Sequence, residues 1–200
     1  MMKAKITVLV SGGGTNLQAL IDAQKSGIIT SGEIALVISN NENAFALERA
    51  KAANIDTAVI TKRAFGESFE EKLIEKIEEY DTDIIVLAGF MSILSENFTK
   101  KYDKKIINVH PSLIPSFCGK GFYGLRVHEA ALEYGVKVTG ATVHFVNEVP
   151  DGGEIIMQKA VSIEDGDTPE TLQKRVMENA EWIILPQSVE KVSKQIVEGR

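Results

Sequence analysis

The segment 6-ITVLVSGGGTNLQAL-20 decides the fold, because an apolar run passes through a glycine-rich turn into a helix-forming stretch. The run Ile6 to Val10 is typical of a strand buried inside a parallel sheet. The stretch from Asn16 to Gln24 is predicted to be a helix. A strand, a tight turn and a helix in this order begin an α/β fold.

The same alternation of apolar runs and helical stretches continues along the chain. Further strands are predicted at 33–39, 57–60, 83–88, 105–110, 138–146 and 154–163. Further helices are predicted at 44–53, 65–80, 125–134 and from Pro169, after a Thr168 N-cap, to about Ile183. Because the short segment NEVPDGG joins the last two strands, we expect them to form a hairpin that joins the sheet.

Composition excludes several classes of protein. The chain has 200 residues, of which 44% are hydrophobic, enough for one globular domain with a substantial core. Its N-terminus lacks an export signal and no apolar run is long enough to span a membrane, so we expect a cytoplasmic protein with no membrane partner. One cysteine, Cys118, and three histidines are too few for a structural zinc site, and the net charge of −6 argues against nucleic-acid binding.

The turn Ser11 to Asn16 is the first candidate site. Glycines at a strand-to-helix turn let backbone N–H groups point at an anion, and the helix N-terminus adds to the attraction. Leu17 and Asn40 stand where the dinucleotide fingerprint has glycine and an acidic residue, so this fingerprint is absent. A phosphate site involving Thr15 and Asn16 and a plain tight turn without a ligand both remain possible interpretations.

Asn108 and His110 form the second candidate, at the end of a predicted strand where side chains two apart share a face. An amide and an imidazole on that edge can stabilise an oxygen that becomes negative during attack. A polar strand end that only caps the loop is the alternative. For His144 a paired position inside the sheet, and for His128 a place on a helix surface, are the simpler interpretations.

Asp151 is the third candidate, although Asp before Gly is also a common turn pair. If the hairpin folds back beside the strand of Asn108 and His110, the carboxylate meets the imidazole and raises its pKa. It would also take a proton, directly or through water, from an attacking amine. Together with a phosphate loop, this group suggests acyl transfer to an amine of a phosphorylated acceptor.

Four stretches, SGGGTNLQAL, VLAGFMSILS, INVHPSLIPSF and TVHFVNEVPDGGEII, resemble the phosphoribosylglycinamide formyltransferases in order and spacing. The resemblance implies a single formyltransferase domain over 1–200. It implies a Rossmann-like parallel N-terminal half and a mixed, mostly parallel sheet of about seven strands flanked by helices. Residues 1–100 would bind the acceptor phosphate, and 101–200 would carry catalysis and folate binding.

The resemblance also implies a reaction and its residues. The enzyme would be a one-carbon transferase that moves the formyl group of 10-formyltetrahydrofolate to glycinamide ribonucleotide in purine biosynthesis, without a metal. Asn108, His110 and Asp151 fall on the catalytic trio, and His144 on a supporting histidine. The acceptor-binding positions are Gly14, Thr15, Asn16 and Glu181. The folate-binding positions are Met91, Ser92, Ile93, Leu94, Asn108, Asn147 and Asp151.

Three stretches depart from the family pattern. Ser92 stands where many members have arginine, so a charged contact to the folate is missing. The stretch MENAEWIILP is one residue longer than usual, so both Glu178 and Glu181 are candidates for the acceptor ribose, and Glu181 is favoured. The segment FCGKGFYG around Cys118 differs from the usual loop and is predicted to be a flap over the acceptor.

Three other functions remain open from the sequence. A 10-formyltetrahydrofolate hydrolase would use the same trio with water as the acceptor, and transfer to another amine is a related alternative. A non-catalytic nucleotide-binding module would need only the SGGGTN loop. The expected partners are small molecules, and the sequence is compatible with a monomer or a homodimer.

Overall fold

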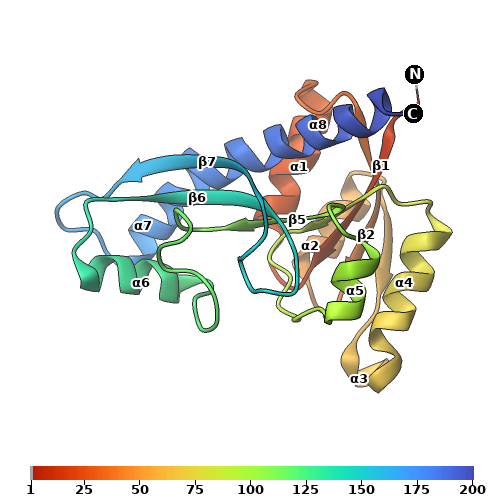
Figure 1. The fold of residues 1–200 in the computed structure, drawn as a ribbon, viewed down its shortest axis with the longest axis horizontal. Helices are drawn as coiled ribbons and strands as arrows, with labels where there is room; N and C mark the ends of the chain where they lie inside the picture. The colour runs from red at the N-terminus through yellow and green to blue at the C-terminus, as the bar shows by residue number, and fades with distance from the viewer. Residues whose placement is uncertain (1) are drawn as a thin grey trace.

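The computed structural model describes residues 2–200 and is built around one sheet of 7 strands in the order β3-β2-β1-β4-β5-β6-β7 (Figure 1). The strands are β1 (Ala4–Val10), β2 (Gly32–Ser39), β3 (Asp56–Val59), β4 (Ile84–Leu87), β5 (Ile106–His110), β6 (Val138–Phe145) and β7 (Ile155–Ser162). The strands β3, β2, β1, β4 and β5 pair in parallel. Strand β6 pairs antiparallel with β5, and β7 pairs antiparallel with β6. The predicted mixed, mostly parallel α/β sheet is confirmed.

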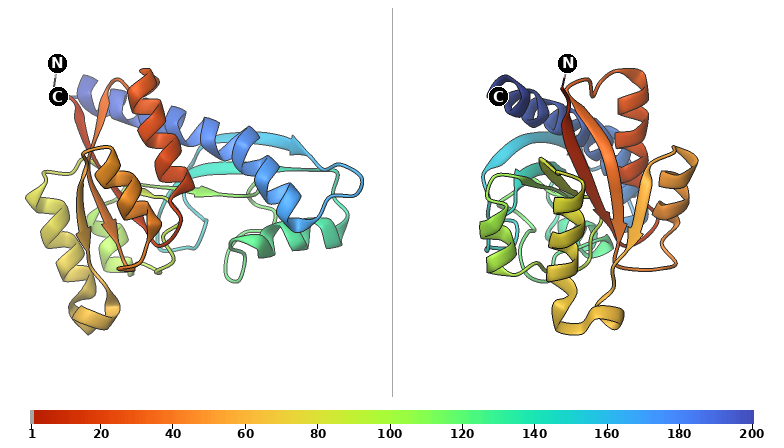
Figure 2. Two further views of the ribbon diagram at one scale, coloured as in Figure 1. Left: turned by 180° about the vertical axis from the view of Figure 1, so that it is seen from behind. Right: turned by 90° about the vertical axis from the view of Figure 1, so that its right-hand side faces the viewer.

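Helices cover both faces of this sheet (Figure 2). They are α1 (Thr15–Ser26), α2 (Phe45–Ala52), α3 (Lys62–Phe65), η1 (Gly66–Ser68), α4 (Phe69–Glu79), α5 (Glu96–Lys101), α6 (Leu125–Tyr134), α7 (Pro169–Val176), η2 (Met177–Glu181) and α8 (Trp182–Glu198). Side chains alternate along β1, so Val8 packs with α1, α2 and α8, while Leu9 packs with α4 and α5. The sheet therefore has a separate apolar core on each face.

The prediction for the last helix was wrong at its C-terminal end. The predicted helix stops near Ile183, but the helical segment continues through η2 and α8 to Glu198, with Pro186 inside α8. Leu185 and Val189 are fully buried against the sheet. This apolar face offsets the unfavourable effect of a proline inside a helix.

Two shorter elements differ from the prediction because local caps determine them. The predicted helix at 65–80 begins at Phe69, after the separate short turn α3, which Thr61 caps by accepting from Ala64 N–H. Helix α5 was not predicted, since its six residues are too few for a periodic pattern. It begins where Ser95 Oγ accepts from the N–H of Phe98.

The predicted hairpin of β6 and β7 is confirmed, and Gly153 lies where its loop closes. A Cβ on Gly153 would lie 1.7 Å from the carbonyl oxygen of Phe145. Phe145 N–H donates to the carbonyl of Glu154 at this point. The loop that carries Asp151 therefore depends on the absence of a side chain at position 153.

We expect Gly153→Ala to lower the free energy of unfolding by about 1–3 kcal/mol, because the backbone must move to admit the methyl group. Urea denaturation measures this change. Gly12→Ala is the matched control, since a Cβ there meets no atom within 4 Å. Equal stability of G153A and the wild-type protein would contradict this account of the hairpin.

Candidate active site

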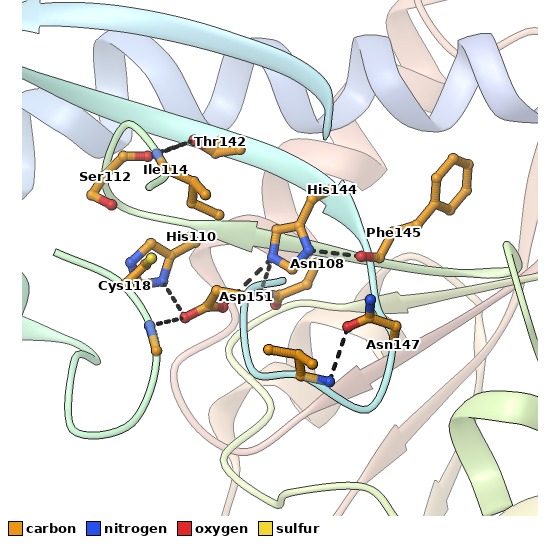
Figure 3. Close-up of polar contacts among 12 residues, drawn as sticks. Asn108, His110, Ser112, Ile114, Cys118, Thr142, His144, Phe145, Asn147 and Asp151 are labelled. Atoms are coloured by element: carbon orange, nitrogen blue, oxygen red, sulfur yellow. Dashed lines mark hydrogen bonds and ion pairs between the residues drawn. The ribbon is translucent and has the colours of Figure 1, made fainter. Parts of the chain in front are cut away.

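Asn108, His110 and Asp151 meet on one face of the sheet (Figure 3). The two strand residues lie at the end of β5, and the loop after β6 turns back over them. His110 Nδ1 lies 3.5 Å from Asp151 Oδ2. Asp151 has a left-handed backbone with φ of 57°, which aims its carboxylate at the imidazole rather than along the turn. The structure therefore brings together the three residues that the sequence analysis singled out.

His144 connects the amide to the carboxylate. It is the cross-strand partner of Asn108 in the β5–β6 pair. Its Nδ1 donates to the carbonyl oxygen of Phe145 at 2.8 Å, so Nε2 is free to accept from Asn108 Nδ2 at 3.2 Å. The same Nε2 lies 3.6 Å from Asp151 Oδ1. His144 thus fixes the orientation of the Asn108 amide and leaves the other amide proton available.

The segment 111–124 folds over this group. Gly119 N–H donates to Asp151 Oδ2 at 2.8 Å, and His110 Nε2 donates to the carbonyl of Phe117 at 2.8 Å. Phe117 packs against Phe122 and Tyr134 with ring centroids 6.3 Å and 6.0 Å apart. In this conformation, backbone groups of the predicted flap are hydrogen-bonded to Nε2 of His110 and to Oδ2 of Asp151.

Burial has a larger effect on His110 than its carboxylate neighbour does. Burial lowers the pKa of His110, and the Asp151 charge and the hydrogen bond to Phe117 only partly oppose this change. The expectation that Asp151 raises the pKa of His110 names a real effect, but the net direction was wrong. For Asp151, burial acts to raise the pKa, but the neighbouring His144 and His110 side chains and the hydrogen bond from Gly119 N–H outweigh it, so the pKa is lowered.

A cavity of about 320 Å³ opens beside this group. Its polar lining comes from elements far apart in the sequence, and includes Asn16, Asn108, His110, His128, Asp151, Gln173 and Glu181. At one wall Asn16 Nδ2 donates to Glu181 Oε2 at 2.8 Å. A ligand in this cavity would contact both the glycine-rich loop region and the Asn/His/Asp group.

The structure distinguishes the two candidate glutamates. Glu181 is 6% exposed and lines the cavity, whereas Glu178 lies on the surface beside Lys174. Both lie in the π-helical turn η2, where an extra residue is accommodated within a helix. Burial raises the pKa of Glu181, and the hydrogen bond from Asn16 opposes that change.

The glycine-rich turn has the geometry of an anion site. Gly14 is left-handed with φ of 73°, and a Cβ there would lie 2.7 Å from that of Ala46, so only glycine fits. Among residues 2–200, no side chain caps the N-terminus of α1. Arg49 Nε donates to the Gly13 carbonyl at 2.9 Å, which fixes the backbone of the turn. Thr15 begins the helix, and Asn16 faces the cavity.

The predicted folate segments reach the cavity through Met91 and Asp151. Met91 lines the cavity, and its N–H donates to Ser11 Oγ at 2.8 Å. Ser92 Oγ accepts from Asn40 Nδ2 at 2.8 Å, so it is held within the protein. Ile93 is 83% exposed, whereas Leu94 packs against the core. Asn147 Oδ1 accepts from the N–H of Val149, which is 54% exposed, at 3.0 Å.

His128 is the residue that sequence reasoning placed wrongly. We interpreted it as a helix-surface residue, but it is 0% exposed and lines the cavity. The signal was available in α6, because His128 lies between the buried residues Val127 and Ala131 on the apolar face.

Within residues 2–200, no helix is long and apolar enough to cross a membrane. In the same part of the chain, no group of three or more His, Cys, Asp and Glu side chains is arranged to hold a metal ion.

A mostly parallel α/β sheet that carries an Asn/His/Asp group beside a glycine-rich loop defines a protein of the acyl-transfer class. The family model described as formyl transferase matches residues 4–189. Phosphoribosylglycinamide formyltransferase of Haemophilus influenzae is 43% identical over 98% of this chain and 88% of that protein. The chain belongs to the formyl transferase family.

Structural similarity supports the same family. The solved phosphoribosylglycinamide formyltransferase of Coxiella burnetii superposes with a TM-score of 0.88 at 41% identity, over 97% of this chain and 89% of that one. The trifunctional purine biosynthetic protein adenosine-3 of Gallus gallus is 45% identical over 98% of this chain. This chain spans only 19% of the length of that trifunctional protein.

Burial of His128 predicts a pH dependence of stability. Its pKa in the folded protein is lowered to about 4 from 6.5, by burial and by His110. The unfolded chain therefore binds more protons between these values, and the free energy of unfolding should fall as the pH is lowered through this range. Urea denaturation at a series of pH values measures the slope. His128→Phe should flatten it, and equal slopes for the two proteins would contradict the assignment.

Proposed function

We propose that this protein transfers the formyl group of 10-formyltetrahydrofolate to the glycinamide amine of glycinamide ribonucleotide, a step of purine biosynthesis. The observation that carries the proposal is the position of Asp151 between His110 and His144, in the lining of a cavity that Asn16 and Glu181 also line. The relatives named as phosphoribosylglycinamide formyltransferases support the choice of acceptor.

Binding of the acceptor would use the loop and η2. The phosphate is placed against Gly14, Thr15 and Asn16, where glycine N–H groups and the α1 N-terminus attract an anion. Glu181 then accepts from the ribose hydroxyls, with Asn16 holding its carboxylate in place. This arrangement directs the amine toward Asp151.

Catalysis would rely on charge stabilisation and proton transfer at the same three residues. As the amine attacks the formyl carbon, the carbonyl oxygen becomes negative and accepts hydrogen bonds from the Asn108 amide and from His110 Nε2–H, which must first leave the Phe117 carbonyl. Asp151 takes the proton of the amine, directly or through water. The bond from the formyl carbon to the folate nitrogen then breaks, and that nitrogen receives a proton.

The donor would bind at the exposed segments near Asp151. Backbone groups of Met91 to Leu94 and of the loop Asn147 to Asp151 can read the polar edge of a pterin. The exposed apolar side chains of Met91, Ile93 and Val149 suit its flat ring. With Ser92 bonded to Asn40, the folate tail lacks the charged contact that arginine supplies in many relatives.

The alternative reactions differ in what they require. A hydrolase needs the trio but no acceptor pocket, whereas here Glu181 and Asn16 build a polar wall opposite the trio. This wall favours transfer to a phosphorylated amine over hydrolysis. The cytoplasmic location, the absence of nucleic-acid or membrane partners, and a monomer or homodimer stay predictions.

The test is a formyl-transfer assay with purified protein, 10-formyltetrahydrofolate and glycinamide ribonucleotide. We expect Asp151→Asn to lower kcat by about 100- to 10,000-fold, because proton transfer is lost, with little change in acceptor affinity. Asp165→Asn, an exposed aspartate far from the cavity lining, is the matched control. Folate consumption without formylated ribonucleotide would instead indicate a hydrolase, and unchanged turnover of D151N would remove Asp151 from the mechanism.

The two glutamates of η2 offer a second test with an internal control. Glu181→Gln should raise KM for glycinamide ribonucleotide about 10-fold, because a charged acceptor of hydroxyl hydrogen bonds is lost. Glu178→Gln should leave KM unchanged, since Glu178 lies on the surface. Steady-state kinetics with the acceptor varied measures both. An effect of E178Q as large as that of E181Q would argue against this placement of the ribose.

A further inference from the structure

His128 is a buried polar side chain that the proposed chemistry leaves unused. It lies in the first turn of α6 and is 0% exposed. Neither of its ring nitrogens has a hydrogen-bond partner among residues 2–200. Buried polar groups in proteins are nearly always paired, and an unpaired one at a cavity wall is a candidate for contact with a ligand.

The surroundings of His128 place it on the acceptor side of the cavity. The same lining includes Gln173 and Met177, which lie one turn apart on the helical segment that also carries Glu181. Helix α6 packs against α7, so this wall is continuous. On its other side His128 approaches His110, because the charge of His110 contributes to lowering its pKa. His128 thus shares one cavity lining with Glu181, the proposed ribose contact, and with His110 of the reacting group.

The protonation state limits what His128 can bind. With a pKa of about 4 it is neutral near pH 7, so it offers one N–H donor and one nitrogen acceptor and no charge. A phosphate or carboxylate on the ligand would favour a positively charged protein side chain, and an ammonium group would favour a negatively charged one. A neutral imidazole suits a neutral group that both donates and accepts a hydrogen bond.

We propose that His128 is a specificity-determining contact for the secondary amide of the acceptor, the group that joins the ribose to the reacting glycyl amine. This inference rests on the proposed function. The acceptor has the order phosphate, ribose, amide and amine, and we match these groups to the glycine-rich loop, Glu181, His128 and Asp151, of which the last three line one cavity. An acceptor without this amide would leave the buried imidazole unpaired, which disfavours its binding.

The inference predicts opposite effects on stability and on acceptor recognition. His128→Phe removes both unpaired nitrogens while filling the volume, so its Tm should be unchanged or higher. Its KM for glycinamide ribonucleotide should rise about 10-fold, because the amide loses its partners. The Kd for a folate analogue should stay unchanged. His128→Gln, which keeps a donor and an acceptor, should restore part of the acceptor affinity.

Val127→Ala is the matched control, because Val127 is the buried neighbour of His128 on α6 and carries no polar side-chain atom. It should lower Tm without a selective change in KM for the acceptor. Steady-state kinetics, thermal melting and folate-analogue titration on the same preparations provide the readouts.

Each result has a definite meaning. An active H128F with unchanged KM overturns the role of His128 and leaves the proposed function intact. A fall in Tm for both H128F and H128Q, with the same KM as V127A, shows a structural role only and overturns the inference. Absence of transfer by the wild-type protein overturns the proposed function, and the assignment of His128 with it.

Discussion

Asn108 of β5 and His144 of β6 face each other across an antiparallel pair, and the whole polar group depends on this register. Side chains alternate between the faces of a sheet, so a slip of one residue would send His144 to the opposite face. In the observed register Thr142 lies opposite His110, and its hydroxyl bonds Ser112 and Ile114. The β5–β6 pairing therefore positions His144 and also holds the first residues of the segment 111–124 in place.

This arrangement buries several polar and titratable side chains close together at the site, which is energetically unfavourable. His110, His128, His144 and Glu181 are all nearly excluded from solvent, and each carries a polar or titratable group. His144 is fully paired, and Asn16 pairs with Glu181. His110 lies against the Phe117 carbonyl and the Asp151 carboxylate, whereas His128 has no partner among residues 2–200. The two cores on either face of the sheet supply the stability that makes such a site tolerable.

Local sequence signals predicted those features that depend on one element or one turn. The strand at 106–110, the Thr168 cap and the glycine-rich turn all follow from short patterns, and the hairpin follows from NEVPDGG. The flap contact of Gly119 with Asp151 and the bond from Asn16 to Glu181 join residues far apart in the chain, which no periodicity encodes. The pKa of His110 could not be predicted either, because its direction depends on how deeply the folded chain buries the ring.

The π-helical turn η2 is wider than an α-helical turn, and it places Glu181 in the lining of the cavity. In a continuous α-helix one extra residue would rotate everything beyond it by about 100°. The buried residues Leu172, Val176, Ala180 and Ile184 nevertheless stay on one face, at a constant spacing of four. A spacing of four exceeds the α-helical repeat, and the wider turn takes up part of the difference. The buried face before η2 and the buried face after it therefore point in the same direction. The irregular geometry is confined to η2, the turn that carries Glu181. Because Asn16 lies at the start of α1 and bonds Glu181 of this turn directly, α1 and η2 must both be in place before this part of the cavity lining exists.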